Sequence, residues 1–330
     1  MVVDNLTEEK ERGAQFLLPQ YVQKWDSRCS IRTRPQKLID FSLEGYFFPP
    51  DKQPLLISET VQEFKQEVKE QILILSFFKY LHDIINLEIA LINKVCNDVI
   101  YEDLPIPFEE YHRLSAYTIL IDEYYHVYLA KLLMNQLNEQ FSDIAPSDYP
   151  ISDSYFSVLE IKKELDVKYH TIFDIIAVCI FETTLVRELV TFFNSSDVHP
   201  SIKYYVNDHM NDESRHYGYF HDLLTFTWKH LPEDYRQAIG VKIARFVKLY
   251  LNINSDKAFN LSILKTLLED EEKAQHIIND IYKEFEVSQD IPIVKNVLNV
   301  LTQVGMMEHA AIKSGFKEIG WNICIKQRLP

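Results

Sequence analysis

The chain has 330 residues and a mass of 39.0 kDa, which suits one large domain or two modest ones. Its formal charge of −15 would repel phosphate backbones and anionic lipids, so neither nucleic acid nor a membrane is expected as a partner. Only 7 glycines occur, with none between Gly45 and Gly218, which excludes the Gly-rich phosphate turns of Rossmann and P-loop nucleotide sites.

The cysteines and the N-terminus indicate a cytoplasmic protein. The four cysteines lie far apart without a C-x-x-C pair, which is typical of packed thiols in a reducing compartment. The start M-V-V-D-N-L-T-E-E-K lacks the basic residues and the apolar run of a signal peptide. No apolar stretch reaches the roughly 20 residues that a membrane helix needs.

Residues 1–57 are expected to form an irregular arm that packs on the rest of the chain. Glycines and prolines interrupt them repeatedly, among scattered aromatic residues. The remaining residues, 58–330, are predicted to form a single all-helical domain.

The first long helix is predicted over about residues 58–98, which contain no glycine or proline and repeat apolar residues at helical spacing. Glu88 interrupts its most apolar part, I-I-N-L-E-I-A-L-I. An unpaired carboxylate buried there would cost on the order of several kcal/mol, so we expect Glu88 to be neutralised or bound to a cation.

A second helix is predicted over about residues 107–141, with Pro107 in its first turn. It contains I-D-E-Y-Y-H, in which Glu123 and His126 are three residues apart and therefore share one helical face. Asp122 directly precedes this Glu-x-x-His motif.

A third helix is predicted over about residues 155–194. The stretch F-D-I-I-A-V-C-I-F-E-T-T-L-V sets Glu182 among apolar residues, as Glu88 is set in the first helix. Glu188 is the rival carboxylate, but Arg187 beside it indicates an ion-paired or solvated residue. The apolar surround therefore favours Glu182 as the buried one.

The fourth helix, over about residues 199–230, contains V-N-D-H-M-N-D-E-S-R-H-Y-G-Y. His209, Glu213 and His216 fall at i, i+4 and i+7, so that their side chains point the same way. Asp212 precedes this second Glu-x-x-His motif, as Asp122 precedes the first.

Three more helical segments are predicted over about residues 232–252, 255–286 and 290–316. They hold no comparable group of polar residues, so we expect them to pack against the first four helices. Spare helices of this kind also suggest a homodimer.

Chance does not account for the two Asp-Glu-x-x-His motifs. Three Glu-x-x-His sequences occur where roughly one is expected, and requiring a preceding Asp lowers that expectation to about 0.06. The third sequence, Glu109 to His112, lacks the Asp and lies in a first helical turn, where an acid is favoured anyway. A metal-bound imidazole usually donates its other N–H to a carboxylate, so Asp122 and Asp212 are candidates for holding the histidine of the opposite motif.

The paired motifs predict a four-helix bundle of the ferritin-like type that holds two metal ions. Such bundles take a Glu-x-x-His motif from each of two helices and one Glu from each of two others. The predicted ligands are Glu88, Glu123, His126, Glu182, His209, Glu213 and His216. Mixed carboxylates and imidazoles suit iron better than zinc or calcium, with manganese as the alternative.

This ligand set resembles that of the diiron N-oxygenases related to p-aminobenzoate N-oxygenase. The 35 residues from Glu88 to Glu123 match the family's spacing, and His209, four residues before the last Glu, separates the family from other diiron bundles. The resemblance covers roughly residues 60–230. It implies two iron ions, O₂ as co-substrate and a small-molecule amine substrate, an aryl amine or an amino acid, free or carrier-bound. The product would be a hydroxylamine, with nitroso and nitro products by further rounds, and a separate reductase or ferredoxin-like protein would supply electrons.

Three positions bear on the substrate. In the aminobenzoate enzymes an Arg stands five residues before the first Glu and an Asn four after the third, and here these places hold Asp83 and Val186. Tyr80, a candidate pocket residue, is retained. The resemblance therefore argues against an aminobenzoate, and Asp83 either meets an ammonium group or is an ordinary solvated acid.

Two other classes of function stay open at this point. One is a different diiron or dimanganese protein, such as a C–H hydroxylase or a ferritin-like oxidase. The presence of His209 is the sequence feature that argues against this alternative. The other is a metal-free helical interaction protein, in which the buried acids would repel one another.

Overall fold

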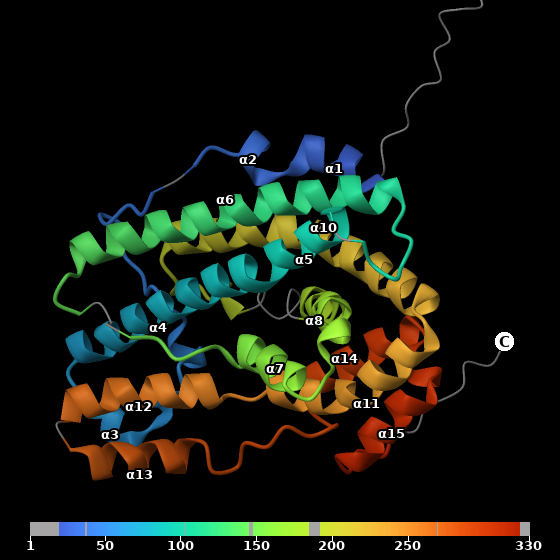
Figure 1. Ribbon diagram of the computed structural model, residues 1–330. Helices are drawn as coiled ribbons and strands as arrows, with labels where there is room; N and C mark the ends of the chain where they lie inside the picture. The colour runs from blue at the N-terminus through green and yellow to red at the C-terminus, as the bar shows by residue number, and fades with distance from the viewer. Residues whose placement is uncertain are drawn as a thin grey trace, which may run out of the picture.

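The computed structural model describes residues 20–36, 38–101, 103–144, 148–184, 192–268 and 270–323. Within these ranges the chain is helical, apart from turns, loops and a single β-bridge between Tyr46 and Val198. It is an all-α bundle of the ferritin-like type, surrounded by shorter helices (Figure 1). This confirms the predicted fold class.

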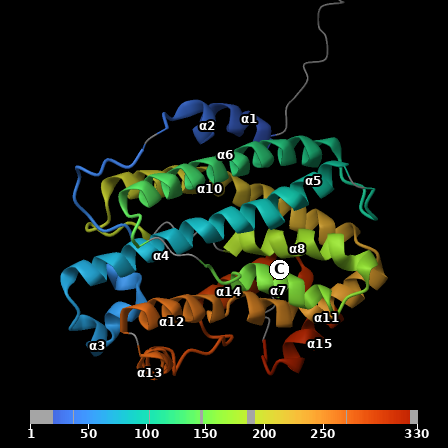
Figure 2. The same cartoon turned by 60° about the vertical axis from the view of Figure 1, so that its left-hand side comes forward.

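Four long helical segments form the bundle. The first runs without interruption from α4 (Gln66–Leu87) through a π-helical segment (Glu88–Ile92) into α5 (Asn93–Tyr101). The others are α6 (Glu110–Gln140), α8 (His170–Thr184) and α10 (Pro200–His230). α6 packs against α4 and α5, and α10 packs against α6 and α8 (Figures 1 and 2).

The third predicted helix is wrong in extent. Instead of one helix over 155–194, the structure has α7 (Asp153–Lys162), a 3₁₀ turn (Val167–Tyr169) and α8. The Asp166 carboxylate accepts a hydrogen bond from the Lys168 backbone N–H, and such a local cap competes with continuation of a helix. Residues 185–191, near the end of the predicted helix, lie outside the described residues.

α8 lies at the centre of the molecule because it is apolar on all sides. Residues 172–184 are all buried, and they share one hydrophobic core with the C-terminal helices. The sequence places Glu182 near the end of this helix. The helix therefore carries a carboxylate into the interior.

Where the sequence predicts three C-terminal helical segments, the described residues form five α-helices. They are α11 (Glu233–Tyr250), α12 (Asn254–Leu268), α13 (Glu271–Ile281), α14 (Pro292–Gln303) and α15 (Ala310–Glu318). A new cap begins α13, where Asp270 accepts from the Lys273 N–H, and α14 ends before Gly305, which has a left-handed conformation with φ of +80°. Because α14 and α11 belong to the same core as α8, we propose that residues 58–330 form one domain.

The N-terminal arm is partly helical, unlike the irregular arm expected. α1 (Gln20–Arg28) and the short α2 (Ser30–Thr33) lie across α6 and α10, as Figure 1 shows at the top of the molecule. A further short helix, α3 (Glu59–Gln62), precedes α4. The arm therefore covers the side of the bundle where the two Asp-Glu-x-x-His motifs lie.

A close backbone contact fastens the arm to the start of α10. The Tyr46 N–H donates to the Asp197 carbonyl at 2.8 Å, and the His199 N–H donates to the Tyr46 carbonyl at 2.8 Å. Gly45 before it has φ of +139°, and a Cβ there would lie 2.6 Å from His199 Cα. The contact requires glycine at this position.

Two expectations from the sequence concern the cysteines and membrane-spanning helices. Cys29, Cys96 and Cys179 are buried free thiols, and Cys324 lies outside the described residues. Among the helices of the described chain, none combines the length and the apolar character that crossing a membrane requires.

Candidate metal centre

The first motif sits in the middle of α6, a helix of 31 residues. Asp122, Glu123 and His126 are buried there, on the face of α6 that is turned toward the bundle. The third Glu-x-x-His sequence lies at the start of the same helix, where Glu109 and His112 form a capping box. That sequence is therefore accounted for as a helix start.

α10 carries the second motif through the bundle. Its start is set by Pro200 in the first turn and by His199, whose side chain accepts from the Ser201 N–H. His209, Glu213 and His216 are buried on one face, as their spacing predicts.

The two isolated glutamates are also buried. Glu88 is the first residue of the π-helical segment, and Glu182 lies in α8. A π-helical segment adds a residue to a turn and so turns the following side chains relative to those before it, and such segments are frequent at functional sites. The sequence carries no clear signal for this segment.

The seven side chains meet in two adjoining groups that share one residue. The possible ligand atoms within each group all lie within 4.8 Å of one another. The first group is Glu88, His126, His209 and Glu213, and the second is Glu123, Glu182, His216 and Glu213. Glu213 belongs to both groups and so lies where it can bridge two ions.

The distances show how closely the groups adjoin. Glu213 Oε1 lies 3.1 Å from His209 Nε2, 3.3 Å from His216 Nδ1 and 3.5 Å from His126 Nδ1. Glu123 also faces both groups, with Oε1 2.9 Å from His216 Nδ1 and Oε2 3.5 Å from His126 Nδ1. Glu88 Oε1 lies 3.3 Å from His209 Nε2, which assigns it to the first group.

Several of these buried atoms make no hydrogen bond within the described chain. They are Glu88 Oε2, both oxygens of Glu123, Glu182 Oε2, and the Nδ1 atoms of His126, His209 and His216. Leaving such atoms unsatisfied in the interior is costly unless a cation binds them. Four carboxylates also carry four negative charges, which two divalent cations would balance. The donor set therefore fits two iron ions.

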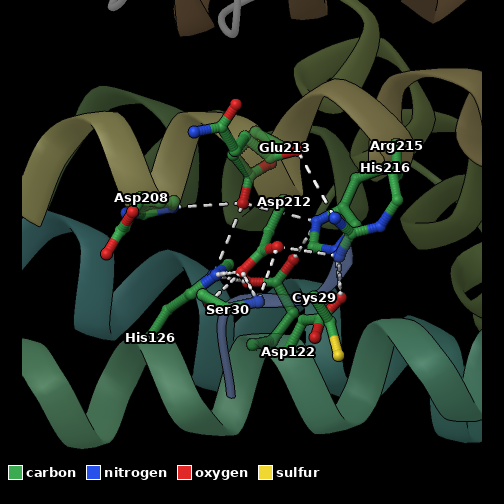
Figure 3. A network of polar contacts seen from close by, with 12 residues as sticks. Cys29, Ser30, Asp122, His126, Asp208, Asp212, Glu213, Arg215 and His216 are labelled. Atoms are coloured by element: carbon green, nitrogen blue, oxygen red, sulfur yellow. Dashed lines mark hydrogen bonds and ion pairs between the residues drawn. The ribbon is translucent and has the colours of Figure 1, made fainter. Parts of the chain in front are cut away.

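A second layer of contacts holds the histidines. His126 Nε2 lies 3.2 Å from Asp212 Oδ2, and His216 Nε2 lies 3.3 Å from Asp122 Oδ2 (Figure 3). Each aspartate thus contacts the histidine of the opposite motif. The Arg215 guanidinium bridges the two aspartates at 2.7 Å from Asp122 and 2.8 Å from Asp212.

Sequence reasoning missed Arg215 and its role. Arg215 stands three residues after Asp212 on α10, a spacing that brings two side chains together on a helix, and this signal could have revealed one of its two ion pairs. Its contact with Asp122 depends on how α6 packs against α10.

Electrostatics in the metal-free protein follow from burial and crowding. Burial and the charge of Glu123 raise the pKa of Glu88 to about 7. Burial and the charges of Glu213 and Glu123 raise the pKa of Glu182 well above its usual value. Burial alone would lower the histidine pKa values, but hydrogen bonds and charges of the neighbouring carboxylates raise that of His209 to about 9 and those of His126 and His216 well above normal. In the absence of cations, these raised pKa values favour the protonated forms of the side chains.

Two of the three substrate-pocket candidates, Tyr80 and Asp83, lie in the described part of the chain. Tyr80 lines a separate cavity, and burial together with the charges of Glu88 and Glu213 raises its pKa. Asp83 lines the same cavity and forms an ion pair with Lys79. Val186 lies in 185–191, outside the described residues.

Comparison with known protein families identifies a relationship. A family model described as P-aminobenzoate N-oxygenase AurF matches residues 30–288, which contain all seven buried side chains of the two groups. No curated protein matches the chain.

Proposed function

The chain belongs to the p-aminobenzoate N-oxygenase family, and on that premise we propose that its seven buried Glu and His side chains hold the two iron ions. The protein is an oxidoreductase, a non-haem diiron enzyme that oxidises aryl amines with O₂. The observation that carries the ligand assignment is the pair of four-residue groups that share Glu213.

In the reaction, the chain itself holds the metal ions, orients their imidazole ligands and shields the centre from water. When bound, the two iron ions supply the activation of O₂ that amine oxidation needs. The carboxylates balance the charge of the ions, and Asp122 and Asp212 fix the orientation of the two imidazoles. Because the seven side chains are buried, bulk water is kept from the centre.

We also propose a separate electron donor. Conversion of an amine and O₂ to a hydroxylamine and water consumes a pair of electrons and a pair of protons. The chain has no Gly-rich turn for a nucleotide or flavin cofactor of the Rossmann or P-loop type. A reductase or a ferredoxin-like protein would fill this role.

The cavity beside Tyr80 is proposed as the amine pocket. It has a volume of about 250 Å³, and apolar side chains such as Phe48 and Phe259 form part of its wall. Aromatic packing supports Tyr80, whose ring centroid lies 4.8 Å from that of Phe193. A flat aryl group would fit between such walls.

The charges of this pocket disfavour a substrate carboxylate. Two lysines line the cavity: buried Lys79 pairs with Asp83 and lies 3.8 Å from Asp256, and Lys52 pairs with Asp51. A carboxylate entering here would meet Asp83 and Asp256, and both lysines of the wall already have an aspartate partner, whereas an uncharged or cationic group would not be repelled by the aspartates. We therefore propose aryl amines without a carboxylate as the substrate class.

Single-turnover oxidation tests both the reaction and the substrate class. We expect the iron-loaded, reduced protein to add oxygen to the nitrogen of uncharged or cationic aryl amines, and to oxidise p-aminobenzoate more than about tenfold more slowly, because of like-charge repulsion. Product masses and O₂ consumption are the measurements. Asp83→Asn keeps the size of the side chain and frees Lys79, so it should raise the relative rate with p-aminobenzoate.

The possible outcomes separate the two claims. Iron-loaded protein that consumes no O₂ with any amine would contradict the proposed reaction. Oxidation of p-aminobenzoate in preference to the uncharged amines would contradict only the proposed substrate class.

We propose that the chain forms a homodimer through an exposed stripe on α6. Tyr117, Ile121, Tyr124 and Tyr128 follow the 4-3-4 spacing of a helix-pairing seam and have exposed fractions of 41%, 42%, 55% and 52%. Light scattering should give twice the 39.0 kDa of the chain, and Ile121→Glu should give the monomer. Asn138→Glu, on an exposed part of the same helix, serves as the control. A monomeric parent protein would refute the stripe as a dimer contact.

A further inference from the structure

The N-terminal helices reach the two aspartates that hold the metal-centre histidines. The Trp25 indole Nε1–H donates to Asp122 Oδ1 at 2.8 Å. The Ser30 backbone N–H donates to Asp212 Oδ1 at 3.1 Å, and the Ser30 hydroxyl donates to Asp212 Oδ2. Figure 3 shows Ser30 lying against Asp212, on the far side of the latter from Glu213.

Both aspartates are thereby surrounded by donors. Asp122 is fully buried and lies within reach of Trp25, Arg215 and His216. Asp212 is also fully buried and lies within reach of Ser30, Arg215 and His126. Each carboxylate is therefore held from three directions, and one of the three is supplied by the N-terminal helices.

The arrangement is the same on both sides of the centre. Trp25 acts on Asp122 and so on His216 of the second group, and Ser30 acts on Asp212 and so on His126 of the first group. A buried carboxylate that loses one donor can turn in its site and pulls harder on its remaining partners, among them the imidazole N–H. A change in such an outer contact alters both the orientation and the basicity of a ligating imidazole.

We propose that Trp25 and Ser30 are positioning residues that hold the two histidines, one for each iron ion, and so slow the loss of iron. This rests on the proposed ligand set. Trp25 lies before the matched range of 30–288, so its contribution comes from a part of the chain outside the family match. The N-terminal helices are then part of the metal centre and not only a cover.

The test compares iron loss in variants that remove single donors. Trp25→Phe removes the indole N–H but keeps an aromatic ring, and Ser30→Ala removes the hydroxyl but keeps the backbone N–H. We expect each variant to lose ferrous iron to a chelator about tenfold faster than the parent protein, in the absence of O₂. Ser30→Thr retains a hydroxyl and should restore the parent rate.

A matched control separates positioning from simple loosening of the helices. The Tyr21 hydroxyl donates to the Gly218 carbonyl at 2.9 Å and to Asp222, which also ties α1 to α10 but does not involve Asp122 or Asp212. Tyr21→Phe should therefore release iron at the parent rate. Faster release in Tyr21→Phe equal to that in Trp25→Phe would overturn the proposal.

Mössbauer spectra of the reduced proteins provide a readout that does not depend on activity. Ser30→Ala should change the ferrous signal of one ion and Trp25→Phe that of the other, because the two residues act on different groups. Unchanged spectra and release rates in both variants, with two irons in the parent protein, would refute the positioning role alone. A parent protein that binds no iron would instead refute the ligand set.

Discussion

Glu213→Ala is expected to remove both iron ions from the protein. Glu213 is the residue that the two groups share, and its Oε1 lies within 3.5 Å of a nitrogen of each of three histidines. Its loss removes one ligand from each ion and also removes one of the negative charges that balance the two ions. We expect iron content near zero by elemental analysis and an amine-oxidation rate more than about 100-fold lower, since even outer contacts of a metal site are worth 10–100-fold.

Variants within one group should have a smaller effect on the iron content. Glu182 belongs only to the second group, so Glu182→Ala should lose mainly one ion and retain roughly half of the iron. Asn211→Ala, at an exposed position of α10, should keep the full content. A Glu213→Ala protein that still holds as much iron as Asn211→Ala would show that Glu213 is not a ligand.

Binding of metal to the iron-free protein at pH 7 is expected to release at least about one proton per chain. The pKa of His209 is about 9 in the iron-free protein, and those of His126, His216 and Glu182 are raised well above their usual values. Each of these groups must give up any proton on its ligand atom before it can bind a metal ion. The apparent affinity should therefore fall as the pH is lowered, by at least about tenfold per pH unit below the pKa of His209.

Calorimetric titration with Mn²⁺ in two buffers of different ionisation heat measures this release, and Mn²⁺ avoids oxidation during the titration. The same shifts determine the stability of the iron-free protein. Because the folded state binds more protons than the unfolded chain between the usual and the raised pKa values, its free energy of unfolding should decrease as the pH rises from about 5 to about 9. Release of less than one proton, or stability that rises over this range, would contradict the expectation.

Much of the bundle could be predicted from the hydrophobic spacing. The helix predicted over 107–141 is α6 (Glu110–Gln140), and that over 199–230 is α10 (Pro200–His230). Both are long and strongly periodic. Pro200 marks the start of α10, but α6 begins at Glu110, after Pro107, which the sequence predicts in its first turn. The helix over 155–194 was wrong because the cap at Asp166 is a local hydrogen bond that the periodicity of the flanking residues conceals. The C-terminal segments were divided incorrectly for the same reason, at Asp270 and Gly305.

In the candidate site, too, the sequence predicts the contacts within one helix. The sequence alone brought Glu123 and His126 together, and likewise His209, Glu213 and His216, because a helix of 3.6 residues per turn places residues three, four and seven apart on one face. It also marked Glu88 and Glu182 as buried acids in need of a partner.

Only the tertiary structure decided which of these side chains meet across the helices. That Glu213 belongs to both groups, that Arg215 bridges Asp122 and Asp212, and that Trp25 and Ser30 reach the same two aspartates all depend on how α1, α2, α6 and α10 pack. Contacts between residues 97 or 182 positions apart follow from the fit of many apolar side chains at once and not from any local repeat, and for that reason they become visible only when the chain is folded.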